Sequence, residues 1–524
     1  MEHEYDSLGD FASIDAAITK HRSITQRLCT FRNSRVPIWR IPDEILSRIF
    51  LFVASDQFYY SVYARYTWMQ IVYVCMRWHR VCFATHQLWA FVDLGNADRV
   101  RALLRLSGNA PLIISQRKPF EPNALRLCLA EMSRIRHFAF EPYESLIYPP
   151  GGVDHSYLPQ ITGISKVLSL HLNFASPTFA RVFVSSSLTH LRCGTMDPPF
   201  SVEEMLAVLD SAPRLLDLEL SGALEYIKSL GLPGVVHRSK TVALPALRCM
   251  ALQDDSTAGV SCALLLQSLQ LPPHVSISLK FGFNEYDMQP LYNLADTLRH
   301  IASTLISYGN RPRTCRIRQD EPRPCQFSSK SDLVCELWPV VHQLSALSDF
   351  SSAPSKAGHV TITLSTVPRS CEMVVFYTTL AALPLSDVSV LAAHLPSYPR
   401  GIGDSWLTDL ASVTHVSAAA HAFAYDLVKD LAAPSDPPLP RLREIMLGDV
   451  QWDKGLPLDT IPLSQRCREV LQARLAKGVP LRSLALRGTT GVDEGALVKL
   501  QDSGLVERVE FCLCGDANAD VSVP

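Results

Sequence analysis

The sequence predicts an α/β protein in which a helical N-terminal module is followed by a long, irregular solenoid of strand–helix units. Up to residue 94, apolar side chains recur at the spacing of amphipathic helices. From residue 95 onward, a short apolar-x-x-apolar-x-apolar pattern recurs, with helix-like segments between its copies. The chain has 524 residues, 47% of them apolar, which is enough for two or more cores or for an elongated array. We therefore expect three parts, at residues 1–35, 36–94 and 95–524.

Residues 8–29 predict an amphipathic helix, which forms most of the first part. Its apolar side chains recur at helical intervals and would share one face. They are Phe11, Ile14, Ile18, Ile24 and Leu28. We expect this face to pack on the module that follows, and pairing with another helix is the alternative.

The second part begins with a helix whose start carries clear physical signals. Pro42 suits a first helical position, because an N–H there would have no partner in the helix. Asp43 and Glu44 complement the positive end of the helix dipole. One apolar face is expected from Ile45, Leu46, Ile49, Phe50 and Val53. A second helix running on toward Cys82 is expected to carry Trp68, Ile71, Val72, Val74, Cys75 and Trp78.

In the third part, each copy of the repeated pattern is expected to form a strand whose alternate residues face inward. The copies are Ile135/Phe138/Phe140, Val167/Leu170/Leu172, Leu188/Leu191/Cys193, Leu215/Leu218/Leu220, Leu247/Met250/Leu252, Leu442/Ile445/Leu447, Leu481/Leu484/Leu486 and Val506/Val509/Phe511. Helix starts are predicted between copies, at Asn96 and at a capping box formed by Ser201 and Glu204. A strand plus a helix every 20–30 residues or so is typical of leucine-rich repeats. We expect an irregular leucine-rich-repeat-like α/β solenoid, and an ordinary α/β domain is the alternative.

Residues 253–441 fit this pattern less well, and two segments, 311–330 and 432–440, are expected to be loops. The first of these loops is rich in arginine: Arg311, Arg313, Arg316, Arg318 and Arg323. No aromatic side chains alternate with these arginines as stacking platforms for bases. We therefore expect a solvated surface loop rather than a nucleic-acid site.

Residues 36–94 resemble an F-box, in the F-box-like form common in mushroom-forming fungi. The residues that carry the resemblance are Ile41-Pro42-Asp43-Glu44-Ile45-Leu46-x-x-Ile49-Phe50, then Trp68-x-x-Ile71-x-x-Val74-Cys75-x-x-Trp78, then Leu88-Trp89. Two positions depart from the usual pattern. Ile41 stands where leucine is usual, and His79-Arg80 follows Trp78 where an arginine is expected. The region after residue 95 looks like the degenerate leucine-rich repeats that often follow such a module.

The resemblance implies a non-catalytic adaptor. An F-box binds the Skp-type adaptor subunit of a cullin–RING ubiquitin ligase, and the repeats capture a protein substrate for ubiquitin transfer. The residues expected to bind the Skp-type subunit are Ile41, Pro42, Glu44, Ile45, Leu46, Ile49, Phe50, Val74 and Trp78. The alternative is a leucine-rich-repeat scaffold without ligase association, in which these side chains pack inside the chain.

Composition and the remaining motifs disfavour other classes of protein. A net charge of −2 gives no global attraction to nucleic acid or to acidic membranes. The most apolar run, Trp68 to Met76, is far shorter than the roughly 20 residues that span a bilayer. Fourteen scattered cysteines are too dilute for a disulfide scaffold, so we expect a cytoplasmic or nuclear protein. Gly403-Asp404-Ser405 is similar to the nucleophile block of one esterase family but precedes a helix-like segment late in the chain, and we expect no catalytic residue, cofactor or metal.

Overall fold

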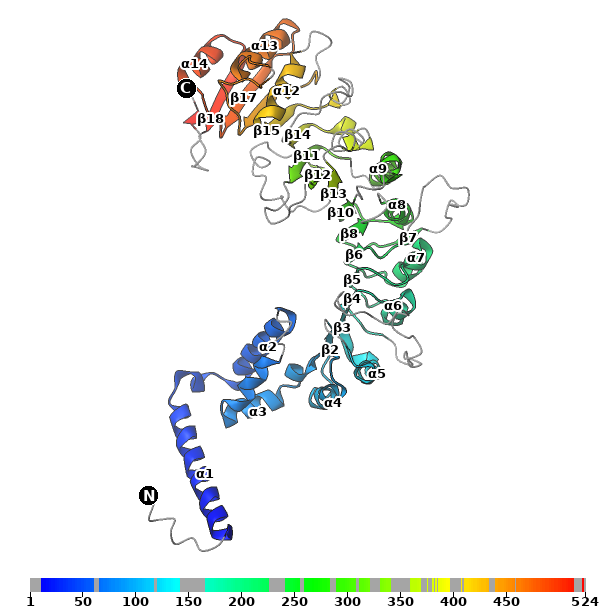
Figure 1. Cartoon of the computed structure of the whole chain (residues 1–524), viewed down its shortest axis with the longest axis vertical. Coiled ribbons are helices and arrows are strands. Elements are labelled where there is room, and N and C mark those ends of the chain that lie inside the picture. Colours follow the sequence, from blue (N-terminus) through cyan, green and yellow to red (C-terminus); the bar gives the residue numbers. More distant parts are fainter. Residues whose placement is uncertain are drawn as a thin grey trace. The chain divides into compact units, whose positions relative to one another are not determined.

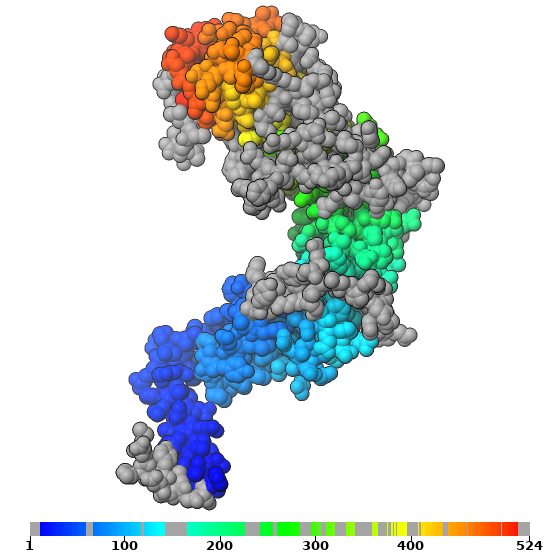
Figure 2. Space-filling view, viewed as in Figure 1, coloured from blue at the N-terminus to red at the C-terminus, as the bar shows by residue number. Residues whose placement is uncertain are grey.

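The computed structural model describes most of the chain. The described residues are 11–60, 66–116, 120–141, 165–225, 241–254, 259–282, 289–307, 311–320, 330–340, 359–368, 375, 379–380, 382–383, 385–395, 407, 410–432, 439–457, 459–512 and 521–522, and the others are grey in Figures 1 and 2. The chain divides into two compact units. Unit 1 comprises Met1–Phe174 and Thr178–Ser187, and unit 2 comprises Ala175–Pro177 and Leu188–Pro524.

Unit 1 begins with helices. They are α1 (Phe11–Ser34), η2 (Pro37–Arg40), α2 (Asp43–Tyr60), η3 (Thr67–Tyr73), α3 (Met76–Ala84) and η4 (His86–Ala90). No residue of α1 is buried, so the expectation that its apolar face packs on the following module is wrong. The expectation of one continuous second helix is also wrong. Cys75 has an extended backbone (φ −162°, ψ 166°), which separates η3 from α3.

The rest of unit 1 alternates strands with helices. Its strands are β1 (Phe91–Val92), β2 (Leu112–Gln116), β3 (Ile135–Phe140) and β4 (Ser169–Leu172), and its helices and turns are α4 (Ala97–Leu106), α5 (Pro122–Leu129), η5 (Met132–Arg134) and most of α6 (Pro177–Phe183). The strands run parallel in chain order. Asn96 caps α4 as predicted, because its side chain accepts a hydrogen bond from the Arg99 N–H at 2.8 Å. Phe138 of β3 stacks on Phe183 of α6 with ring centroids 4.3 Å apart, which places the core between sheet and helices.

Unit 2 is built on a long, mostly parallel sheet. In spatial order its strands are β5 (His190–Cys193), β6 (Asp217–Ser221), β8 (Cys249–Asp254), β10 (Ser276–Gly282), β13 (Val360–Pro368), β12 (Lys330–Trp338), β11 (Thr314–Asp320), β14 (Val390–His394), β15 (His415–Ala419), β16 (Glu444–Gly448), β17 (Leu481–Arg487), β18 (Val506–Cys512) and β19 (Val521–Ser522). Two short strands, β7 (Val242–Ala243) and β9 (Leu269–Gln270), pair separately. The helices are α7 (Val202–Asp210), α8 (Val260–Gln267), α9 (Gln289–Ser307), α12 (His421–Leu431), α13 (Leu463–Ala476) and α14 (Glu494–Asp502), with the turn η7 (Leu385–Asp387).

The repeated apolar pattern supplies the core of this sheet, which confirms the expected α/β class and a sheet consistent with leucine-rich-repeat-like units. At β6 the pattern residues Leu218 and Leu220 are buried, as is Leu215 just before the strand, while the residues that alternate with them in the strand are only half-buried. Figure 1 shows α7, α8 and α9 along one side of the strands they connect. The predicted capping box also forms: Ser201 Oγ accepts from the Glu204 N–H at 3.2 Å, and Glu204 accepts from the Ser201 N–H at 3.1 Å.

The centre of unit 2 departs from the repeat, and here the expected loop at 311–330 is wrong over residues 314–320, while residues 321–329 lie outside the described residues. Within it, Thr314–Asp320 form β11, which pairs parallel with β14 and antiparallel with β12. Arg316 is fully buried instead of solvated. Its Nε lies 2.5 Å from Glu336 on β12, and its guanidinium lies over the Trp338 ring. Most of the other expected loop, 433–438 of 432–440, lies outside the described residues.

Candidate partner-binding site

The start of α2 is held in place by an arginine that the sequence analysis did not single out. Arg77 of α3 donates to the Asp43 carboxylate, with Nε 2.8 Å from Oδ1, and also to the carbonyl oxygens of Trp39 and Ile41. Its guanidinium lies over the Trp39 ring. These contacts join η2 and the first turn of α2 to α3. No local pattern in the sequence marked Arg77, because its partners Asp43, Trp39 and Ile41 lie 34, 38 and 36 residues away.

One face of α2 belongs to the interior of unit 1. Leu46 and Phe50 are 0% and 2% exposed, and Phe50 packs on Trp78 with ring centroids 5.0 Å apart. Further along the helix Ala54 and Phe58 are also buried. Leu46 and Phe50 therefore cannot contact a partner in this conformation. Their assignment as partner-binding residues is corrected: they hold α2 on the rest of the module.

A second face of α2 is open and apolar. Ile45, Ile49 and Phe52 are 44%, 42% and 74% exposed, and they follow one another at intervals of four and three residues. Residues at these intervals lie on the same face of a helix, so the three form one stripe, called here the α2 stripe. Phe52 was missed by the sequence analysis, although it continues the spacing of Ile45 and Ile49.

The other residues expected to contact a partner differ in their exposure to solvent. Pro42, Glu44 and Val74 are exposed, whereas Ile41 and Trp78 are half-buried. Tyr73 and Met76, which flank Val74 and Cys75 at the junction of η3 and α3, are also exposed and had not been predicted. Large apolar side chains in water are costly when they gather on one small module. The module therefore offers hydrophobic contact area at its surface.

One thiol of the module is deeply buried. Burial raises the pKa of the Cys82 thiol to about 11, so this thiol stays protonated at neutral pH and is a poor nucleophile. Among the residues that the structure describes, no three His, Cys, Asp or Glu side chains gather in a way that could hold a metal ion. The Gly403–Ser405 stretch lies outside the described residues.

Unit 2 offers a second candidate surface on the outward face of its strands. On β5 and β6, His190 lies 2.9 Å from Asp217, and Arg192 lies 3.1 Å from Glu219. These side chains are partly or largely exposed and face away from the buried leucines of the same strands. A comparable half-exposed pair, His415 and Glu444 at 3.4 Å, joins β15 to β16. A surface that carries such pairs of opposite charge is better suited to binding a polar protein surface than an apolar one.

A group of ionisable side chains in unit 2 has a structural role. Asp459, in the loop before α13, lies 3.0 Å from Lys429 and 2.9 Å from Arg466. Tyr425 O–H donates to the Ile461 carbonyl in the same loop at 2.8 Å. The hydrogen bond from Lys429, with help from Arg466, lowers the pKa of Asp459 to about 2. The cluster joins this loop to α12 and α13.

Replacing Asp459 with asparagine is expected to lower the melting temperature by roughly 2–4 °C at neutral pH, a small effect because the group is near the surface. The folded pKa of Asp459 lies below its ordinary value of 3.8, so its stabilising contribution is complete well above pH 4. That contribution is lost as the pH falls from about 4 toward 2. Thermal melts of both proteins across this range should therefore converge at the acidic end, and a difference that stays constant with pH would contradict this role.

The fold and the exposed surfaces define an α/β protein with N-terminal helices that carry an open apolar stripe, and with a long, mostly parallel sheet consistent with leucine-rich-repeat-like units. No model of a known protein family matches the chain, and no curated protein sequence is significantly similar to it. Among the described helices, none is long and apolar enough to cross a bilayer.

Proposed function

We propose that this protein is a substrate receptor of a Skp–cullin–F-box ubiquitin ligase, in which the module at 36–94 binds the Skp-type subunit. The observation that carries the proposal is the α2 stripe of Ile45, Ile49 and Phe52, exposed on a helix that begins at Asp43, directly after Pro42. This stripe lies within the segment whose residues resemble an F-box.

The energetics of protein interfaces support this role for the stripe. Aromatic and aliphatic anchors that become fully desolvated contribute most of the binding energy in many complexes. Among the α2 side chains whose exposure is described, Phe52 is the most exposed large apolar one, and two isoleucines precede it on the same face. The buried side chains of Leu46 and Phe50 pack the helix onto the rest of the module, and Arg77 holds its first turn. The stripe therefore lies on a helix that is already fixed in position. A supported stripe loses little conformational entropy when it binds.

The repeat unit is proposed to hold the protein substrate. Stacked strand–helix units of leucine-rich-repeat type present a long outward sheet face, and such faces commonly serve as binding surfaces. The exposed charge pairs on β5–β6 and β15–β16 would contribute specificity there.

The test is binding of the purified full chain to a recombinant Skp-type subunit. The double variant I45D/I49D should weaken binding by about 100-fold or more, because it places two carboxylates where an apolar partner would pack. Its melting temperature should stay close to that of the unchanged protein, since both positions are already open to water.

A matched control is available on unit 2. Leu475 and Val498 are 43% and 42% exposed on α13 and α14, nearly the same as the two isoleucines. L475D/V498D should bind the Skp-type subunit as tightly as the unchanged protein. If I45D/I49D also binds without loss, the ligase assignment is wrong.

The burial of Leu46 and Phe50 supports the alternative, in which the protein is a scaffold without ligase association. If the module only stabilises the repeats, I45D/I49D should change neither the melting temperature nor any Skp-type binding, while a change at Leu46 should destabilise the chain. Selective loss of Skp-type binding with an unchanged melting temperature would exclude the scaffold.

A further inference from the structure

Helix α1 exposes an apolar face that the proposed ligase role does not use. Its large apolar side chains run from Phe11, which is 89% exposed, to Leu28 and Phe31, which are 65% and 60% exposed. None of the 24 residues of α1 is buried. Helices in proteins owe most of their stability to the packing of such a face, so a helix without that packing is expected to have a partner. The length of α1 can be followed in dark blue in Figure 2.

The order of these side chains is symmetric about His21. Counting outward from His21, isoleucines stand three positions away on both sides, at Ile18 and Ile24. Seven positions away stand Ile14 and Leu28, and ten positions away stand Phe11 and Phe31. A two-fold interface requires that if residue i of one copy meets residue j of the other, then j also meets i. A symmetric order of this kind meets that requirement when two copies run in opposite directions.

We propose that α1 pairs with α1 of a second copy of this chain, in an antiparallel arrangement with the two-fold axis beside His21. Phe11 then lies level with Phe31 of the other copy, Ile14 with Leu28, and Ile18 with Ile24. The interface is the helix-to-helix type, in which anchors at intervals of three and four residues interlock.

The charges of α1 favour the antiparallel orientation over the parallel one. The helix carries Lys20, Arg22, Arg27, Arg32 and a single acidic residue, Asp15. A parallel pair would place every arginine level with the same arginine of the other copy. The antiparallel pair instead places Asp15 level with Arg27 and sets the two helix dipoles in opposite directions.

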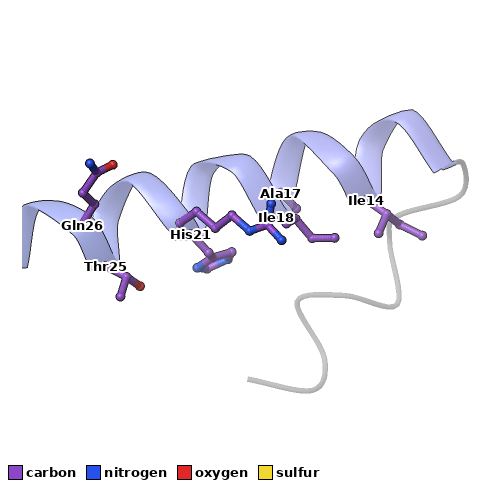
Figure 3. Close-up of a pocket in the computed structure, with 7 residues that line it drawn as sticks. Ile14, Ala17, Ile18, His21, Thr25 and Gln26 are labelled. Atoms are coloured by element: carbon purple, nitrogen blue, oxygen red, sulfur yellow. The ribbon is translucent and has the colours of Figure 1, made fainter. Parts of the chain in front are cut away.

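The central turns of α1 are shaped to receive another element. A hollow beside them is lined by Ile14, Ala17, Ile18, His21, Arg22, Thr25 and Gln26. Figure 3 shows Ile14, His21 and Thr25 on the same side of the helix. Small Ala17 between larger neighbours leaves room for a side chain from the second copy.

The first test is the molar mass of the full chain in solution, measured by light scattering at several protein concentrations. The unchanged protein should approach twice its chain mass of 58.2 kDa. I18D/I24D should remain at the mass of one chain, whereas A16D/S23D, on the opposite face of α1, should still dimerise. H21L should move dissociation to about tenfold lower concentration, because it replaces the polar centre of the interface by an apolar side chain.

The second test reports orientation, in a background in which the exposed thiols Cys29 and Cys249 are both changed to serine. With oxidised glutathione as the oxidant, H21C should form a covalent dimer, since both copies of residue 21 lie at the axis. F31C should not, because in the antiparallel pair its two copies lie about 30 Å apart at 1.5 Å per residue. Cross-linking through F31C would overturn the antiparallel arrangement.

A chain that stays monomeric at every concentration overturns the proposal. If that monomer co-sediments with phosphatidylserine vesicles, the face is assigned to an anionic membrane surface instead. The dimer is separable from the ligase proposal, since I45D/I49D should leave the mass of the dimer unchanged.

Discussion

Replacing Glu336 with alanine is expected to lower the free energy of unfolding of unit 2 by about 3–5 kcal/mol, the range measured when one partner of a buried ion pair is removed. Arg316 is fully buried and lies 2.5 Å from Glu336, which is 2% exposed. The alanine variant removes the carboxylate from the buried guanidinium and leaves a positive charge in a medium that solvates it poorly. Urea denaturation followed by circular dichroism measures the change.

The matched control is Glu219 to alanine, which breaks the exposed pair with Arg192 on β5 and β6. Exposed pairs contribute about 0–1 kcal/mol, so this variant should unfold at nearly the same urea concentration as the unchanged protein. Replacing both buried partners, as R316M/E336L, should restore most of the stability lost in the single variant. Equal effects of the Glu336 and Glu219 changes would contradict the burial of the central pair.

Replacing Leu46 with alanine is expected to destabilise unit 1 by about 2–5 kcal/mol, as for other fully buried leucines. Ile45, its neighbour in sequence, is 44% exposed, and Ile45 to alanine should cost less than about 1 kcal/mol. Thermal or urea unfolding of the two variants side by side gives the comparison. A similar loss at both positions would mean that the two faces of α2 are not divided as described.

The same pair of variants separates folding from recognition. Under the proposed ligase role, Ile45 to alanine should weaken binding to the Skp-type subunit without changing the unfolding transition. Leu46 to alanine should act through stability, so its effect on binding should disappear under conditions in which the variant is fully folded. Changing both Ile45 and Leu46 to aspartate would confound the two effects, whereas I45D/I49D does not.

The apolar spacing of the sequence was enough to predict α2 and its start. Pro42 and the two acidic residues after it act through local backbone geometry and the helix dipole, which need no distant partner. The spacing did not tell which of two adjacent aliphatic residues faces inward. Ile45 and Leu46 point about 100° apart around the helix, and the packing of Trp78 against Phe50 decides which of the two directions is covered.

The segment 311–330 shows where composition misleads. Several arginines among prolines are typical of a solvated loop, and that interpretation was wrong for β11. The buried position of Arg316 depends on Glu336 and Trp338, which lie about 20 residues away on an antiparallel strand. No local pattern around Arg316 records that pairing, because the carboxylate that compensates its charge comes from another strand.

By itself, the sequence determined the features that arise within a few residues or from a repeated period. These are the helices α1 and α2, the capping box at Ser201, the apolar triplets that are buried at most of the strands, and the α/β class. The tertiary structure alone decided the insertion of β12 and β13 between β10 and β11, the interior position of Leu46 and Phe50, and the open face of α1. The physical reason is that periodicity specifies which residues share a face, whereas burial and charge compensation depend on which distant element covers that face.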